Sequence, residues 1–241
     1  MKITEKMKMD RDGLEKYGSI NIVVFGDSVT HGAVDPGVMD YDSVYWNRLR
    51  KMLTAKRNYV PINVINAAIG GTTALQSVKR FEDQVMRFKP DLLIICFGLN
   101  DVNGALEDYL KSLKYFFDRA KEEKVDTIYM TPNMLNTYVA EGTAEMNLSY
   151  AKKTAEYQNG GKMDLFMSES MKLAQSSGVY VCDCYGEWKK LAETKDTTQM
   201  LANYINHPRR EYHEIFASKL YELIISDSEE IKNTEESTMY K

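Results

Sequence analysis

Residues 20–32 read INIVVFGDSVTHG, and this stretch sets the expectations for the rest of the chain. Its first six residues are almost all apolar, which is typical of a buried strand. The residues that follow include two glycines and an Asp-Ser pair, which end a strand and favour a turn. We therefore expect a strand at 20–25 with a polar turn at its carboxyl end.

The same pattern of a short apolar run bounded by turn-forming residues recurs along the chain. Four further strands are expected at 62–65, 92–97, 127–130 and 179–182. Segments with helical spacing lie between them, at 45–53, 74–88, 109–120 and 163–174. This alternation predicts an α/β fold, a three-layer α/β/α sandwich with a five-stranded parallel sheet, because parallel crossovers must run over the faces of the sheet. Ligands of such sheets bind beyond the carboxyl ends of the strands.

Size and composition indicate a globular protein with one hydrophobic core. The chain has 241 residues, of which 44% are hydrophobic and 27% charged, and it can bury a sizeable core. We expect a single domain over 1–241, with its core at about 20–225 and a polar tail at 227–241 that frays. Residues 132–161 form a long connection, which we interpret as a partly helical insertion near the site; a disordered excursion is the alternative.

Charge and the amino-terminal sequence exclude several classes of partner. A formal net charge of −4 offers no concentrated cationic face for nucleic acid. A small neutral molecule is therefore the expected partner. Residues 1–18 lack the apolar stretch of a secretory signal, and no run approaches the length of a membrane span. We expect a cytoplasmic protein with no membrane partner, and the sequence leaves the oligomeric state open.

Three cysteines, Cys96, Cys182 and Cys184, lie in or beside apolar runs. Their odd number argues against a disulfide framework. Cys182 and Cys184 lack companions at metal-ligand spacing, so we interpret all three as small buried hydrophobes.

Four short blocks carry the chemistry, and each follows a predicted strand or lies in a loop. They are GDSVTHG at 26–32, NAAIGGTT at 66–73, GLND at 98–101 and NHP at 206–208. Alone, Gly-Asp-Ser is most often a helix-capping turn. Together and in this order, the blocks resemble the signature of the SGNH hydrolases, the GDSL-like lipases and acylhydrolases, over about residues 20–225. The resemblance implies a flavodoxin-like fold and ester hydrolysis.

The resemblance also implies a role for each matching residue. Ser28 corresponds to the nucleophile and His207 to its base. The oxyanion hole is formed by the N–H groups of Ser28 and Gly71 and the side-chain amide of Asn100, with Gly70 as the neighbouring alternative to Gly71. Acyl transfer needs a nucleophile within reach of a base, and donors aimed at the oxyanion. No cofactor and no metal is required.

Only three histidines are available as the base. His31 lies one helical turn beyond Ser28 and is interpreted as a helix-face or pocket-wall residue. His213 lies where the family often has a structural histidine. His207 fits best, because Pro208 favours an extended or turn conformation before it and can begin the final helix.

The acid of the triad departs from the family pattern. The family usually has Asp three residues before the histidine, and here that residue is Tyr204. We expect a Ser-His dyad in which the imidazole of His207 is oriented by the side-chain oxygen of Asn203 or by a backbone carbonyl. Asp183 is the ionised alternative, although a loop or capping role suits it better.

Two further carboxyls, Asp27 and Asp101, adjoin candidate residues and invite a metal interpretation. We expect both to cap turns, because no clustered ligands accompany them.

The sequence predicts a serine esterase acting on short acyl esters, including O-acetyl groups on carbohydrates. Lysophospholipase or thioesterase activity and a non-catalytic carbohydrate-binding relative are the alternatives. Nucleotide binding is disfavoured, because the first loop lacks a glycine-rich phosphate cradle.

Overall fold

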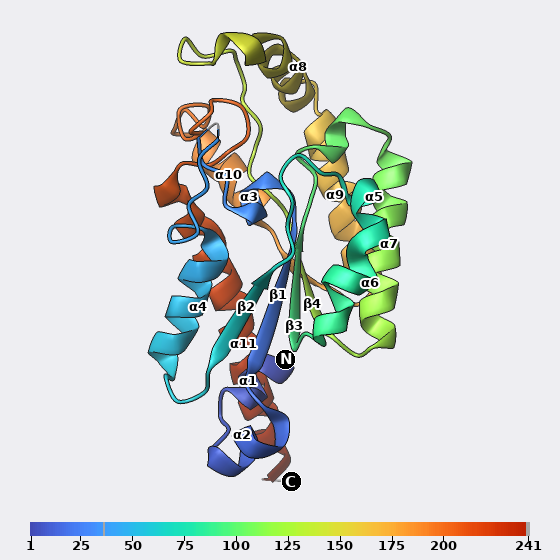
Figure 1. The fold of residues 1–241 in the computed structure, drawn as a ribbon, viewed down its shortest axis with the longest axis vertical. Coiled ribbons are helices and arrows are strands. Elements are labelled where there is room, and N and C mark those ends of the chain that lie inside the picture. Colours follow the sequence, from blue (N-terminus) through green and yellow to red (C-terminus); the bar gives the residue numbers. More distant parts are fainter. Residues whose placement is uncertain (36, 240–241) are drawn as a thin grey trace.

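A twisted parallel sheet forms the centre of the molecule in the computed structural model, which describes residues 1–35 and 37–239, with side chains through residue 226 (Figure 1). Within these residues the sheet has five strands, in the order β2-β1-β3-β4-β5. Every neighbouring pair is parallel. The strands are β1 (Ile20–Gly26), β2 (Ile62–Asn66), β3 (Leu92–Cys96), β4 (Asp126–Met130) and β5 (Tyr180–Cys182). The predicted strands are confirmed, with ends that differ by one residue at most.

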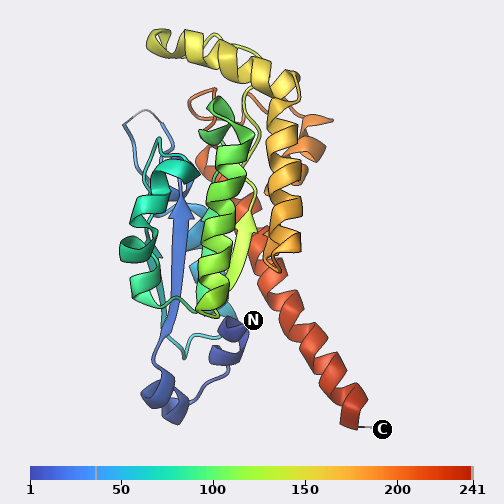
Figure 2. The ribbon, with the colours of Figure 1, turned by 90° about the vertical axis from the view of Figure 1, so that its right-hand side faces the viewer.

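Helices cover both faces of the sheet, which confirms the three-layer sandwich (Figures 1 and 2). One layer contains α4 (Tyr45–Lys56), α10 (Cys184–Ala192) and α11 (His213–Met239). The other contains α5 (Ala74–Ser77), α6 (Phe81–Gln84), α7 (Leu106–Glu122) and α9 (Lys162–Ser176). The short α3 (Ser28–His31) follows β1 directly at the upper edge of the sheet in Figure 1.

Two regions differ from the sequence expectation. The segment 74–88 is not one helix, because 3-10 turns at Val78–Arg80 and Met86–Phe88 interrupt it. The interruption accompanies a buried guanidinium, since Arg80 donates to the carbonyl oxygen of Ala67 and to Ser77 Oγ. At the amino terminus, α1 (Lys2–Lys6) and α2 (Arg11–Tyr17) form where the charged sequence carried no clear helical pattern.

The long connection is partly helical, as expected. It contains a 3-10 turn at Glu145–Asn147 and α8 (Leu148–Asn159), and α8 lies across the upper end of the molecule (Figure 2). Gly161 ends the connection with φ +76° and begins α9, a backbone conformation that favours glycine.

The carboxyl tail continues α11 as far as Met239, so its backbone is helical where we expected fraying. Its side chains, and residues 240–241, lie outside the described residues. No helix in the described part of the chain is both long and apolar enough to cross a bilayer.

Candidate active site

The nucleophile candidate lies in the tight turn between β1 and α3. At Gly26 a Cβ atom would come within 2.4 Å of the carbonyl oxygen of Cys96, so only glycine lets β1 approach β3 this closely. Asp27 caps α3 by accepting a hydrogen bond from the N–H of Val29 at 3.1 Å. Ser28 is therefore the first residue of the helix and lies beyond the carboxyl end of β1.

His207 reaches this serine from the far end of the chain. Its Nε2 atom lies 2.9 Å from Ser28 Oγ, across 179 residues of sequence. An antiparallel bridge between Leu201 and Pro208 closes the loop that carries it, and the N–H of Ala202 donates to the His207 carbonyl oxygen at 2.7 Å. The structure thus brings together the two residues that the sequence paired.

Asn203 does not orient the imidazole, which corrects that expectation. Its side-chain oxygen accepts hydrogen bonds from the N–H groups of Ile205, Asn206 and His207, each at 3.0 Å. An asparagine oxygen readily accepts from backbone groups a few residues ahead in the chain. Asn203 therefore shapes the loop, and only through the loop does it affect the ring.

The second ring nitrogen of His207 is buried. This atom, Nδ1, has no well-formed hydrogen bond within the described residues. Burial lowers the pKa of His207 below its ordinary value, whereas the backbone of Val34 and the carboxylate of Asp35 act to raise it. Of the open alternatives, orientation by a backbone carbonyl stays a prediction, and no sequence signal marks a main-chain acceptor.

Tyr204, in the position where the family usually has Asp, points into the insertion. Its φ of +56° is unusual for a bulky residue. Its ring occupies the space beside Gly142, where a Cβ atom would lie 2.5 Å from the ring carbon Cε2. The side chain that replaces the acid therefore packs the insertion against the loop of the catalytic histidine.

The loop that carries Gly70 and Gly71 lies beside Ser28, and Asn100 is joined to that loop. A Cβ atom at Gly70 would lie 3.6 Å from Ser28 Cβ, so the loop after β2 passes directly beside the nucleophile. The N–H groups of Ser28 and Gly71 have no acceptor within the part of the chain that the structure describes. Asn100 Nδ2 donates to the Thr72 carbonyl oxygen at 3.2 Å, which ties the third block to the second.

The carboxyls near the site cap turns, as expected. Asp101 accepts from the N–H groups of Ala74 and Gly98, at 2.8 and 3.0 Å. Burial raises the pKa of Asp27 and of Asp101 to about 7 in each case. Asp183 accepts from the N–H of Gly186 at 2.9 Å and caps α10, so it is not the ionised partner of the histidine.

The remaining expectations for histidine and cysteine also hold. His213 is fully buried, and its Nδ1 accepts from the N–H of Tyr45 at 3.3 Å. Burial lowers the pKa of His213 to about 3, so it is a neutral structural residue. The three cysteines are buried and unbridged. Within the described residues, no group of three or more His, Cys, Asp and Glu side chains is arranged to hold a metal ion.

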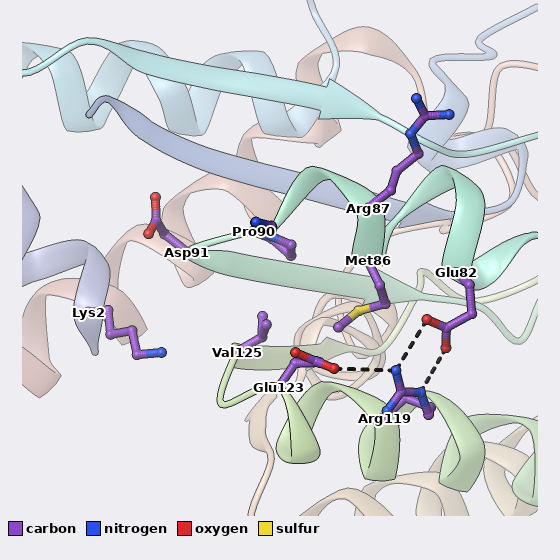
Figure 3. Close-up of a pocket in the computed structure, with 10 residues that line it drawn as sticks. Lys2, Glu82, Met86, Arg87, Pro90, Asp91, Arg119, Glu123 and Val125 are labelled. Carbon is purple, nitrogen blue, oxygen red and sulfur yellow. Dashed lines mark hydrogen bonds and ion pairs between the residues drawn. The ribbon is translucent and has the colours of Figure 1, made fainter. Parts of the chain in front are cut away.

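A cavity of about 580 Å³ lies at the opposite edge of the sheet, where β3 and β4 begin (Figure 3). One of its lining cations, Arg119, is paired with lining carboxylates. Figure 3 shows Arg119 joined to Glu82, at 2.8 Å, and to Glu123, at 3.5 Å. The cavity contains no nucleophile beside a base, so its size does not make it the candidate site.

Comparison with known proteins agrees with this geometry. Residues 24–215 match the model of the GDSL-like Lipase/Acylhydrolase family. The chain belongs to this family of ester-hydrolysing enzymes. The match covers all four blocks that the sequence singled out and places them within the SGNH type of hydrolase.

A curated relative matches part of the chain. Over 128 residues the chain is 32% identical to a protein named "Uncharacterized lipoprotein YqeF" from Bacillus subtilis (strain 168), a match that covers 49% of this chain and 51% of that protein. The chain thus spans about half the length of this curated relative.

Two solved structures share the fold. The acetylxylan esterase Axe2 from Geobacillus stearothermophilus superposes with a TM-score of 0.66 at 20% identity, over 85% of this chain and 94% of that one. A lipase/acylhydrolase from Enterococcus faecalis superposes with a TM-score of 0.65 at 22% identity, over 85% and 95%.

Proposed function

We propose that this protein is a serine esterase that hydrolyses short acyl esters, including O-acetyl groups on carbohydrates, through an acyl-enzyme. The observation that carries the proposal is the 2.9 Å contact between Ser28 Oγ and His207 Nε2. The N–H groups of Ser28 and of Gly71, which follows the glycine beside Ser28, have no acceptor within the described residues. A nucleophile, a base and free donors at one carbonyl-sized position are the requirements of acyl transfer.

In the first half of the reaction, His207 Nε2 takes the Ser28 hydroxyl proton as Oγ bonds to the ester carbonyl carbon. The carbonyl oxygen becomes an oxyanion, which accepts hydrogen bonds from Ser28 N–H, Gly71 N–H and Asn100 Nδ2. The bond to the alcohol oxygen then breaks, and His207 returns its proton to the departing alcohol. Ser28 is left acylated.

In the second half, water attacks the acyl group while His207 accepts a proton from it. Collapse of the second tetrahedral intermediate releases the carboxylic acid, and the proton on His207 returns to Ser28 Oγ. A main-chain carbonyl at Val34 can orient the imidazole but carries no full negative charge to stabilise imidazolium. We therefore expect slower turnover than a complete Ser-His-Asp triad provides.

Preference for small acyl groups is the finer part of the proposal. It is supported by the fold shared with an enzyme titled an acetylxylan esterase. Exposed apolar side chains in the segments after α3 and β2 favour longer acyl groups instead: Met39, Tyr41 and Ile69 are 44%, 51% and 41% exposed. Of these, Ile69 directly precedes the glycine loop beside Ser28. Longer acyl chains are accordingly the competing substrates.

The test combines turnover with covalent labelling. Wild-type protein and Ser28→Ala are incubated with p-nitrophenyl esters from acetate to octanoate, with acetylated xylo-oligosaccharide and with a fluorophosphonate. We expect turnover that is fastest with acetate, release of acetate from the oligosaccharide, and one phosphonate adduct, located at Ser28 by peptide mass spectrometry. Ser28→Ala is the matched control and should lose both signals.

Each other outcome assigns a different function. Faster turnover of the octanoate ester would favour a lipase or thioesterase over an acetylesterase. Neither turnover nor labelling would leave the non-catalytic carbohydrate-binding alternative. A cytoplasmic location and a small-molecule ester as the only partner stay predictions, because the relative from Bacillus subtilis is named a lipoprotein.

A further inference from the structure

The imidazole of His31 makes a contact that reaches beyond its own helix. His31 is the last residue of α3, and its N–H donates to the Asp27 carbonyl oxygen at 2.9 Å. The turn that begins at Ser28 therefore fixes its position. Its Nδ1 atom accepts a hydrogen bond from the N–H of Gly70 at 3.2 Å. The helix of the nucleophile is thus tied to the loop that follows β2.

In the proposed mechanism that loop supplies an oxyanion donor, the N–H of Gly71. Its two glycines leave the direction of this N–H less restricted. A Cβ atom at Gly70 would lie 3.6 Å from both Ser28 Cβ and His31 Nδ1, whereas one at Gly71 would have no atom within 4 Å. Gly71 has φ +75°. Two consecutive glycines have wide conformational freedom. Packing of side chains therefore does not set the direction of the Gly71 N–H.

The glycine pair lies in a turn that Thr72 closes, since its N–H and its Oγ1 donate to the Ile69 carbonyl oxygen at 3.4 and 2.8 Å. The hydrogen bond to His31 links this turn to α3. Before the pair, the N–H of Ile69 donates to the Gly26 carbonyl oxygen at 3.2 Å. After it, Asn100 Nδ2 donates to the Thr72 carbonyl oxygen at 3.2 Å. Within the described residues, the contact with His31 is the one side-chain hydrogen bond to either glycine of the pair.

We propose that His31 is a positioning residue of the oxyanion hole: it holds the Gly70 peptide so that the Gly71 N–H is presented to the oxyanion formed at Ser28. This inference rests on the proposed esterase function. In this contact Nδ1 is the acceptor, so the ring tautomer that makes it carries its proton on Nε2. An oxyanion exists only after attack on the ester, so loss of this alignment lowers kcat and leaves KM nearly unchanged.

Three variants separate the acceptor from the bulk of the ring. His31→Asn places an amide oxygen near the position of Nδ1, His31→Gln places its amide near Nε2, and His31→Ala removes both. With p-nitrophenyl acetate, we expect Ala and Gln to lower kcat by about 10-fold to 100-fold, with KM within about threefold of wild type. His31→Asn should retain several times the kcat of His31→Gln, because its acceptor lies where the Gly70 N–H points.

A second readout distinguishes positioning from a purely structural role. A boronic acid that forms a tetrahedral adduct with serine should inhibit the Ala and Gln variants more weakly than wild type, by a factor similar to their loss of kcat. Urea unfolding of each variant reports whether the fold is intact. Equal kcat in Asn and Gln, a loss confined to KM, or wild-type kcat in Ala would each overturn the inference. Wild-type protein that neither turns over nor is labelled at Ser28 would overturn the proposed function and this inference with it.

Discussion

The two edges of the sheet hold polar groups in opposite states. At the amino edge, a cavity of about 580 Å³ contains the ion pairs of Arg119, which include Glu82 at 2.8 Å. At the carboxyl edge, buried atoms stay without a protein partner, among them His207 Nδ1 and Asp27 Oδ2. Buried polar atoms are almost always hydrogen-bonded, so an unpaired one needs an explanation. Cavity volume is the wrong guide here, because the ion-paired Arg119 has little capacity left for a substrate.

The difference follows from the direction of the strands. In a parallel sheet every strand delivers its following loop to the same edge. Ser28, Gly70 and Asn100 all follow strands, and β1 lies between β2 and β3. Their loops therefore converge without any requirement that they be near in sequence.

Removal of the base at the carboxyl edge should cause the largest loss of activity. We expect His207→Ala to lower kcat/KM for p-nitrophenyl acetate by about 10⁴-fold, because Ser28 then loses its proton acceptor. The double variant Ser28→Ala/His207→Ala should be no slower than either single variant, since the two residues act as one unit. Stopped assays with each purified variant measure this; a loss below tenfold in His207→Ala would remove His207 from the mechanism.

Removal of an oxyanion donor should have the next largest effect. Asn100→Ala deletes the side-chain amide and is expected to lower kcat by about 10²-fold to 10³-fold, with a smaller change in KM. Asn103→Ala is the matched control on the same turn, because its amide donates to the Asn100 carbonyl oxygen and to Tyr150. If both variants lose activity equally, catalysis depends on the conformation of the turn and not on the side-chain amide of Asn100.

The buried carboxyls should make stability depend on pH. The pKa of Asp27 is raised from 3.8 to about 7 in the folded protein, so the folded state keeps a proton that the unfolded chain has released. The free energy of unfolding therefore falls as pH rises from about 4 to 7, and it levels off above that.

Asp27→Asn tests this dependence. The variant should reduce the fall between pH 5.5 and 7 by about 2 kcal/mol, measured by urea unfolding at both values. Asp118→Asn, which removes an exposed carboxyl paired with Lys114, serves as the control. An unchanged fall in Asp27→Asn would mean that Asp27 is ionised throughout this range.

The amino edge should show the smallest effect on catalysis. Arg119→Ala breaks the ion pairs that line the cavity of Figure 3, yet kcat/KM should stay within about twofold of wild type, because exposed ion pairs contribute little and the cavity takes no part in the reaction. Turnover of p-nitrophenyl acetate measures this. A tenfold loss would link the two edges and contradict the comparison.

Much of the fold was predictable because it depends on local patterns. The strand that precedes Ser28 and the loop before Pro208 follow from residue type and neighbours. The break within 74–88 was not predictable, because it accompanies Arg80 reaching the Ala67 carbonyl oxygen. The role of Asn203 was missed for a related reason. Its side-chain oxygen can accept a hydrogen bond from an imidazole N–H or from backbone N–H groups, and only the shape of the loop decides between them.

By itself, the sequence determined the sandwich, because apolar periodicity is a property of the chain. Its resemblance to the SGNH hydrolases supplied the meaning of the four blocks and the choice of Ser28 and His207. Only the tertiary structure decided what surrounds the imidazole, which glycine lies beside the serine and what His31 holds. These depend on distances between segments that are far apart in sequence. Side-chain oxygens and ring nitrogens accept whichever donor folding brings within about 3 Å.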